Sequence, residues 1–187
     1  GRKNIRGRLL PHVRWFQAWN EPNLSTHLSP QYDSSRKPFA ALWYRRMTRA
    51  FRQGVKTGGG AAAVVVAGGL APFGSVSGAA AGTSPQAFGR DAMCVKRTRK
   101  GLAAIRGCDA AAFDIWSQHP YDIAGSPSRR ADRQGMRGLV ADLPAIRATL
   151  DRAVALRTVV PVRRKSLWVT EFDWWTNPPS TRYGKPE

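Results

Sequence analysis

The chain has 187 residues, of which 42% are hydrophobic and 22% charged, and its 30 Lys and Arg against 12 Asp and Glu give a formal net charge of +18. This length suits one domain or part of one, and the many aromatic and branched residues exclude a chain that is disordered throughout. The most apolar segment, Ala61 to Leu70, has about half of the roughly 20 residues that a membrane-spanning helix needs, so we expect no membrane span.

The first half of the chain contains two predicted strands with one predicted helix between them. Val13 to Trp19 is rich in aromatic residues and predicts a strand. Phe39 to Val55 places most of its apolar residues on one helical face, which predicts an amphipathic helix that ends at Gly58 to Gly60. Ala63 to Ala67 is an unbroken run of small and branched residues, typical of a strand that is buried on both sides of a parallel sheet.

A long loop and a basic helix are predicted after this strand. Gly68 to Gly89 is rich in Gly, Ala and Ser and predicts a loop, and Arg90 to Ile105 predicts a helix. Cys94 and Cys108 flank this basic stretch and are near enough in sequence to close a short loop. We favour a disulfide between them over two buried free thiols, and a disulfide fits a secreted enzyme.

The second half of the chain continues the same alternation of strand and helix. Ala112 to Gln118 predicts a third strand and Leu167 to Phe172 a fourth, with a helix between them that starts near Leu139 or Leu143 and continues through Leu156. The alternation predicts an α/β fold with a parallel sheet, either closed as a barrel or open. Four βα units make half of an eightfold barrel, which takes about 250 residues.

Polar residues gather at the carboxyl ends of these predicted strands, where both barrels and open sheets place their sites. Glu21 follows the first strand, and Glu171 lies near the end of the fourth. Of two carboxyl groups at a common mouth, one can protonate a leaving oxygen while the other attacks the anomeric carbon or activates water. The pair therefore predicts the hydrolysis of a glycosidic bond.

Tryptophans are concentrated around the same strand ends. Because the apolar C–H faces of sugar rings pack well on indole rings, Trp19, Trp174 and Trp175 are candidates for substrate binding. The tryptophans in mid-strand are interpreted as core residues: Trp15, Trp116 and Trp168.

Three short motifs resemble one enzyme family. Asn20-Glu21-Pro22 follows an aromatic strand, His119-Pro120-Tyr121 follows the third strand, and Thr170-Glu171-Phe172 belongs to the fourth. Their order and spacing are similar to those of strands four, six and seven in the retaining glycoside hydrolases of the (β/α)8 clan A, which includes cellulases. Families 5 and 39 of that clan are the nearest in type. Residues 1–187 then correspond to part of a catalytic domain of the TIM-barrel type, from strand four to strand seven.

The resemblance implies a role for each motif residue in a double-displacement reaction. Glu21 is implied to be the general acid/base and Glu171 the nucleophile, while Asn20 binds the sugar 2-hydroxyl. Tyr121 is implied to orient the nucleophile, and His119 to line the subsite. The implied substrate is a β-glycoside or an oligo- or polysaccharide, and a retaining pair should have its carboxyl groups about 5 to 5.5 Å apart.

Two alternatives to a working hydrolase stay open. A pI of about 11.4 also suits a basic carbohydrate- or nucleic-acid-binding module without catalysis. The basic residues lie in separate short groups and arginine outnumbers lysine. We therefore interpret the charge first as a genomic composition bias and second as an anion-binding surface, and we expect no nucleic-acid partner. The second alternative is an inactive truncated barrel with two unpaired strand edges.

The sequence shows neither a metal-ligand pattern nor a recognisable signal peptide. His12, His27 and the two cysteines lack the spacing of metal ligands, so we expect no metal and no cofactor. The chain does not open with a basic segment followed by an apolar one, so no signal peptide is visible, and we expect an extracellular protein on the strength of the cysteine pair.

Overall fold

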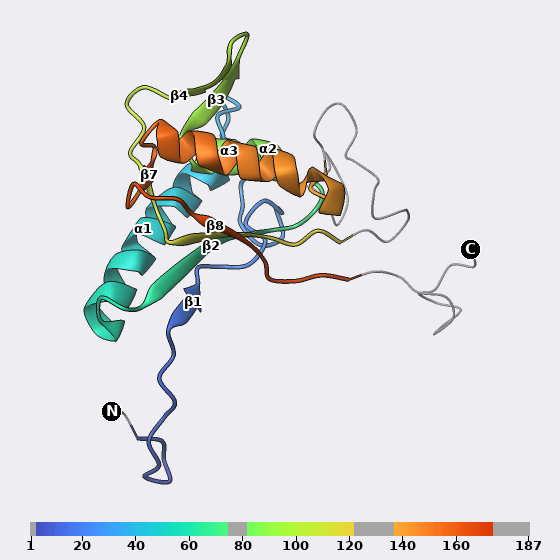
Figure 1. Ribbon diagram of the computed structural model, residues 1–187. Helices are drawn as coiled ribbons and strands as arrows, with labels where there is room; N and C mark the ends of the chain where they lie inside the picture. Colours follow the sequence, from blue (N-terminus) through green and yellow to red (C-terminus); the bar gives the residue numbers. More distant parts are fainter. Residues whose placement is uncertain (1–2, 75–81, 122–136, 174–187) are drawn as a thin grey trace, which may run out of the picture.

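The central feature of the fold is a four-stranded parallel sheet (Figure 1). In the computed structural model, which describes residues 3–74, 82–121 and 137–173, the strands have the order β1-β2-β6-β8. They span Trp15–Gln17 (β1), Val64–Leu70 (β2), Ile115–Gln118 (β6) and Ser166–Val169 (β8), and each neighbouring pair is parallel. The prediction of an α/β fold with a parallel sheet is therefore confirmed.

Three helices pack on one face of this sheet (Figure 1). They are α1 (Phe39–Gly59), α2 (Pro85–Ala92) and α3 (Leu143–Ala155), the last preceded by a short 3-10 turn at Val140–Asp142. Alternate residues of the central strands meet the helices in one apolar core, whose large, fully buried members include Tyr44, Phe88, Phe113, Trp116 and Leu150. Within the described part of the chain, no helix is long and apolar enough to cross a membrane.

The opposite face of the sheet is not covered by these helices. Trp15 and Trp168 point to that face, because their neighbours in the strands, Phe16 and Leu167, are in register with core residues. Both indoles are exposed, Trp15 by 52% and Trp168 by 36%, so the prediction that they are core residues is wrong. Only Trp116 of the three mid-strand tryptophans belongs to the core.

The predicted helix from Arg90 to Ile105 is also wrong. Helix α2 ends at Ala92, and the chain then forms an antiparallel hairpin of β3 (Val95–Thr98) and β4 (Gly101–Ala104). The helix starts earlier than predicted because the Ser84 side chain accepts a hydrogen bond from the Ala87 N–H, which caps its first turn. It ends because Cys94 has φ +60°, a left-handed conformation that does not continue a helix.

The other predicted strands differ from the observed ones mainly in their ends. Strand β2 continues through Gly68 and Gly69, which were expected to start a loop. The predicted strand from Ala112 to Gln118 is divided into β5 (Ala111–Ala112), which pairs with β7 (Val159–Val160), and β6. Strand β8 ends at Val169, so Glu171 lies in the segment that follows the strand.

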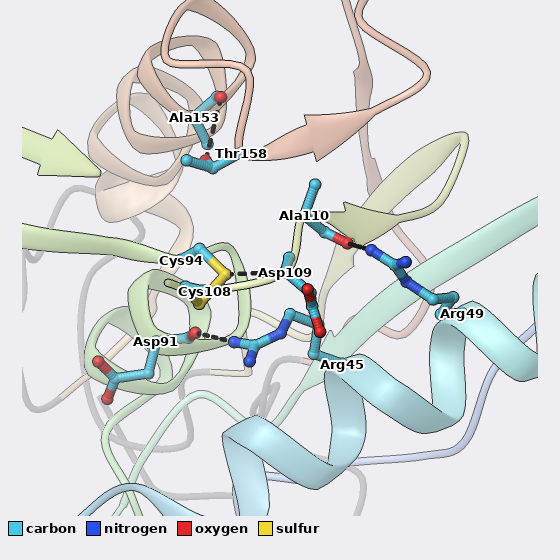
Figure 2. The surroundings of a disulfide bond; sticks show 9 residues. All are labelled: Arg45, Arg49, Asp91, Cys94, Cys108, Asp109, Ala110, Ala153 and Thr158. Atoms are coloured by element: carbon cyan, nitrogen blue, oxygen red, sulfur yellow. Dashed lines mark hydrogen bonds between the residues drawn. A yellow bond between two sulfur atoms is a disulfide. The ribbon is translucent and has the colours of Figure 1, made fainter. Parts of the chain in front are cut away.

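A disulfide joins Cys94 and Cys108 and closes the β3–β4 hairpin at its base (Figure 2). Two arginines of α1 reach the segments beside it, since Arg45 donates to the Asp91 carbonyl and Arg49 to the Ala110 carbonyl. The hairpin is thus attached at its base to the helical layer rather than to the central sheet.

Candidate active site

The two glutamates follow strands at opposite edges of the sheet, yet their side chains meet over its middle. The Glu21 N–H donates to the Gly69 carbonyl, which brings the segment after β1 across the end of β2. The Thr170 N–H donates to the Gln118 carbonyl, so the segment after β8 stays beside β6. One carboxylate oxygen of each glutamate and a ring nitrogen of His119 all lie within 4.8 Å of one another.

His119 connects the two carboxylates. Its Nδ1 is 3.3 Å from Glu21 Oε1 and 3.6 Å from Glu171 Oε2, and its Nε2 is 3.1 Å from the Thr170 hydroxyl. The tautomer with a proton on Nδ1 satisfies all of these groups, because Nδ1 then donates to Glu21 and Nε2 accepts from Thr170. The side chain is fully buried, and each ring nitrogen has a hydrogen-bond partner, as buried polar groups require.

Tyr121 holds the second carboxylate. Its hydroxyl donates to Oε2 of Glu171, whose side chain is 42% exposed. Burial raises the pKa of the Tyr121 phenol, and the hydrogen bond to Glu171 and the charges of Glu171 and Glu21 raise it further. The phenol therefore stays protonated at neutral pH, and it donates to Glu171 throughout that range.

The backbone around Glu21 has an uncommon conformation. Trp19 has φ +65° and Glu21 has φ +44°, both in the left-handed region that residues other than glycine seldom adopt. Two hydrogen bonds fix this turn, one from the Glu21 N–H to Gly69 and one from the Leu24 N–H to the Glu21 carbonyl. The turn directs the Glu21 carboxyl inward, where it is only 15% exposed.

The two glycines at the end of β2 are required by the close packing of this site. Gly69 has φ +57°, and a Cβ there would lie 2.7 Å from Nε2 of Gln17 and 3.3 Å from Nε2 of His119. A Cβ on Gly68 would lie 2.3 Å from the Ser117 carbonyl oxygen. Only glycine therefore lets β2 bend beneath the histidine and accept the hydrogen bond from Glu21.

Tyr44 of α1 supports the same bend from the helical side. Its hydroxyl accepts a hydrogen bond of 2.7 Å from the Gly68 N–H and donates to the Ala18 carbonyl at 3.0 Å. Burial raises the pKa of Tyr44 to about 12, although the hydrogen bonds with Gly68 and Thr48 oppose the rise. One buried phenol thus joins the ends of β1 and β2 just before the residues of the site.

Replacing Tyr44 with phenylalanine is expected to lower the free energy of unfolding by about 1 to 3 kcal/mol, because the buried Gly68 N–H and Ala18 carbonyl each lose a partner. Urea unfolding followed by circular dichroism measures the change. Tyr32→Phe is the matched control, since Tyr32 is 45% exposed and its variant should unfold as the wild type does. Equal stability of the two variants would show that the Tyr44 hydroxyl does not hold the bend.

A second histidine, His27, faces the other oxygen of Glu21. Its Nδ1 is 3.6 Å from Glu21 Oε2, and its carbonyl accepts a hydrogen bond of 3.1 Å from the Trp19 indole. From the sequence, His27 was expected only to lack the spacing of a metal ligand, and no role at this site was predicted for it. No local sequence pattern indicates His27, because only the turn after β1 brings this residue close to Glu21. Thr170 was not predicted either, although it lies within the third motif.

The structure thus brings four of the predicted site residues together: Glu21, His119, Tyr121 and Glu171. Asn20 and Trp19 lie at the same strand end with exposed side chains, and half of the Trp19 surface is accessible. Trp174 and Trp175 lie outside the described residues. Their predicted contact with substrate stays a prediction.

The same cluster has the ligand types of a metal site, which the sequence analysis did not foresee. Glu21, His119 and Glu171 each offer one ligand atom within the 4.8 Å group, and carboxylate and imidazole both bind zinc. These atoms already take part in hydrogen bonds with one another and with Tyr121. A cation would have to displace those hydrogen bonds.

Comparison of the chain with protein-family models, curated proteins and solved structures gave no match. The chemistry of the site therefore has to come from its own geometry. Two close carboxyl groups with different surroundings, one half-buried between histidines and one exposed beside a phenol, suit a reaction that needs both an acid and a nucleophile.

Proposed function

We propose that this chain is part of a retaining glycoside hydrolase, in which Glu21 is the general acid/base and Glu171 the nucleophile. The observation that carries the proposal is the separation of at most 4.8 Å between a carboxylate oxygen of Glu21 and one of Glu171. Retaining enzymes have carboxyl groups about 5 to 5.5 Å apart, while inverting enzymes have about 6.5 to 9.5 Å to admit a water. This separation favours the retaining arrangement over the inverting one.

The reaction then proceeds in two displacements. Glu171 attacks the anomeric carbon while Glu21 gives its proton to the leaving oxygen, so that a glycosyl ester forms on Glu171 and the aglycone departs as an alcohol. Glu21, now a carboxylate, takes a proton from water, and the hydroxyl displaces Glu171 from the anomeric carbon. The donor Tyr121 keeps one oxygen of Glu171 fixed and leaves the other free to attack.

The arrangement of the elements supports a partial (β/α)8 barrel. All three helices lie on one face of a parallel sheet, as they do on the outside of such a barrel. The other face presents Trp15 and Trp168, and in the described part of the chain β1 and β8 are edge strands. Further parallel strands on these edges would cover both indoles and turn the face into a barrel interior.

The proposed substrate is a β-linked oligo- or polysaccharide in an extracellular setting. The exposed Trp19 indole, fixed by its hydrogen bond to His27, offers a flat apolar surface next to Glu21 for a sugar ring. Asn20, on the same turn, is the candidate donor to the sugar 2-hydroxyl. The disulfide favours secretion, because disulfides persist mainly in oxidising compartments.

The test is to trap the intermediate. An aryl 2-deoxy-2-fluoro-β-glycoside should inactivate the protein and add the mass of one fluorosugar to the peptide that contains Glu171. Proton NMR of a slow aryl β-glycoside substrate should show the β-anomer as the first product. Label on another residue, or an α-anomer formed first, would overturn the proposal. Activity that is lost on treatment with EDTA would point instead to a metal held by Glu21, His119 and Glu171.

A further inference from the structure

The β3–β4 hairpin is strongly basic, with four cations in the five residues from Lys96 to Lys100. Residues 95–107 contain no acidic side chain, and they carry cations that are all exposed: Lys96, Arg97, Arg99, Lys100 and Arg106. The hairpin projects from the helical layer on the side away from the central sheet (Figure 1). Its charges are therefore not neutralised by acids on the hairpin, and they are accessible to a large partner.

A hollow of about 200 Å³ lies between the hairpin, α2 and α3, and two arginines line it. Arg90 comes from the last turn of α2 and Arg97 from β3, with Thr98, Leu102 and Thr149 completing the walls. Arg97 forms no ion pair with any residue that the structure describes. Two guanidinium groups of the same hollow repel each other, and an anion between them would remove that repulsion.

Arg90 is partly buried and lies close to the second positive charge of the hollow, Arg97. Burial lowers the pKa of the Arg90 guanidinium, and the charge of Arg97 lowers it further, while Asp91 acts in the opposite direction. Burial also raises the pKa of Asp91 to about 6, so this carboxyl is a weak counter-charge in mildly acidic solution. No acidic side chain is among the residues that line the hollow, so no described carboxylate lies between the two guanidinium groups.

The hollow is held in one shape before any ligand arrives. The disulfide closes the hairpin at its base, and the Arg152 side chain of α3 donates to the Leu102 carbonyl at 3.1 Å. The turn of the hairpin is fixed by Thr98, whose hydroxyl donates to the Gly101 carbonyl at 2.8 Å. Rigid positioning of charged groups favours binding, because less conformational freedom is lost when a ligand binds.

We propose that this hollow binds a sulfate or carboxylate group of an acidic polysaccharide, held between Arg90 and Arg97. The exposed Lys96, Arg99 and Lys100 then contact further anionic groups along the same polymer. Guanidinium groups suit this role, because their planar N–H groups can bond both oxygens of a sulfate or carboxylate. The inference is independent of the proposed hydrolysis, because none of these residues belongs to the cluster around Glu21 and Glu171.

Two observations favour a polysaccharide over a nucleic acid. Disulfides persist mainly in oxidising compartments, so the Cys94–Cys108 bond favours an extracellular setting, in which acidic polysaccharides are available as polyanions. Residues 95–107 contain no aromatic side chain, whereas single-stranded nucleic acid is held by bases stacked on aromatic rings. Double-stranded DNA, which needs only phosphate contacts, is the competing partner and forms one arm of the test.

The test measures binding of fluorescently labelled polymers to the whole chain by anisotropy: heparin for sulfate, polygalacturonate for carboxylate, dextran as a neutral polymer and a DNA duplex. Heparin or polygalacturonate should bind, with affinity that falls as salt rises, and dextran should not. Arg97→Gln should weaken that binding about tenfold, the loss expected for one charge-assisted contact. Arg8→Gln is the matched control, because it removes the same charge from an exposed arginine of the N-terminal segment and should leave the affinity unchanged.

Three results would overturn the proposal. Equal weakening by Arg97→Gln and Arg8→Gln would mean that binding reports net charge alone. Tighter binding of the duplex than of either acidic polysaccharide would assign the surface to nucleic acid. No loss of binding in a Lys96→Gln/Lys100→Gln double variant, whose fold is checked by circular dichroism, would show that the polymer does not extend along the hairpin as proposed.

Discussion

Replacing Glu171 with alanine is expected to lower kcat on aryl β-glycosides by a factor on the order of 10⁴ to 10⁶, the range seen when an enzyme loses its nucleophile. Glu171 is the exposed carboxylate of the pair, and Tyr121 and His119 both contact its Oε2. Without this carboxylate no glycosyl ester can form, and the other acid, Glu21, is directed at the leaving group. Steady-state hydrolysis of a nitrophenyl glycoside measures the loss.

Added azide should restore turnover to the Glu171→Ala variant. The shortened side chain leaves space beneath the anomeric carbon, and azide can attack there while Glu21 still protonates the leaving oxygen. The product is then a glycosyl azide with inverted configuration, which NMR identifies. Glu171→Gln fills the same space with an amide and should not be rescued.

Added azide should give the Glu21→Ala variant a glycosyl azide of the opposite anomeric configuration. With a nitrophenol leaving group, which needs little protonation, the glycosyl ester on Glu171 still forms, and azide then attacks it from the side that Glu21 occupied. This second displacement gives a glycosyl azide of retained configuration. The same configuration from both variants would contradict the assignment of roles, and a large loss in the distant exposed control Asp151→Ala would point to misfolding.

Sequence patterns predicted the parts of the fold that local composition determines. The apolar composition of the run from Ala63 to Ala67 is enough to favour a buried strand, and most of this run lies in β2 in the centre of the sheet. The amphipathic segment from Phe39 to Val55 forms α1 with its apolar face in the core. In both cases the periodicity of the side chains and the final environment agree, so the pattern is sufficient.

The segment from Arg90 to Ile105 could not be predicted from local pattern. Its basic and apolar residues have a spacing that is compatible with a helix, but the hairpin is stabilised by contacts distant in sequence. The disulfide connects its two ends, and Arg152 of α3 bonds to its second strand. Tertiary contacts of this kind override helix propensity, which contributes less than about 1 kcal/mol per residue for ordinary residues.

Four residues of the candidate site were predictable from the sequence, whereas His27, Thr170 and the geometry of the site were not. The order of three motifs indicated Glu21, His119, Tyr121 and Glu171, because strand ends converge at one edge of a parallel sheet. The position of His119 between the two carboxylates depends on the bend at Gly69, which only the three-dimensional packing reveals.

Replacing Asp114 with alanine is expected to lower the free energy of unfolding by about 3 to 5 kcal/mol, the cost of removing one partner from a buried ion cluster. The Asp114 side chain is 2% exposed and faces Arg52, Lys56 and Arg163 at 3.1 to 3.5 Å. It also accepts a hydrogen bond of 3.1 Å from the Val65 N–H of the central strand. The loss of this carboxylate leaves three cations facing one another.

The effect should depend on pH in a defined direction. Burial alone would raise the pKa of Asp114, but the hydrogen bond from Val65 and the charges of Arg52 and Lys56 outweigh burial and lower that pKa. The stabilisation is therefore fully present above the unfolded pKa of about 3.9 and is lost as the pH falls through the lower folded value. The difference between wild type and Asp114→Ala, measured by urea unfolding, should be large at pH 7 and shrink below pH 4.

Two variants separate the charge of Asp114 from its shape. Asp114→Asn keeps the volume and can still accept from Val65, so it should lose the pH-dependent part of the stabilisation and retain the rest. Asp151→Asn removes an exposed carboxylate from its pair with Arg147 on α3 and should cost less than about 0.5 kcal/mol. If Asp114→Asn were as stable as the wild type at pH 7, the cations around this carboxylate would contribute nothing, and the cluster would be held by the hydrogen bond to the central strand alone.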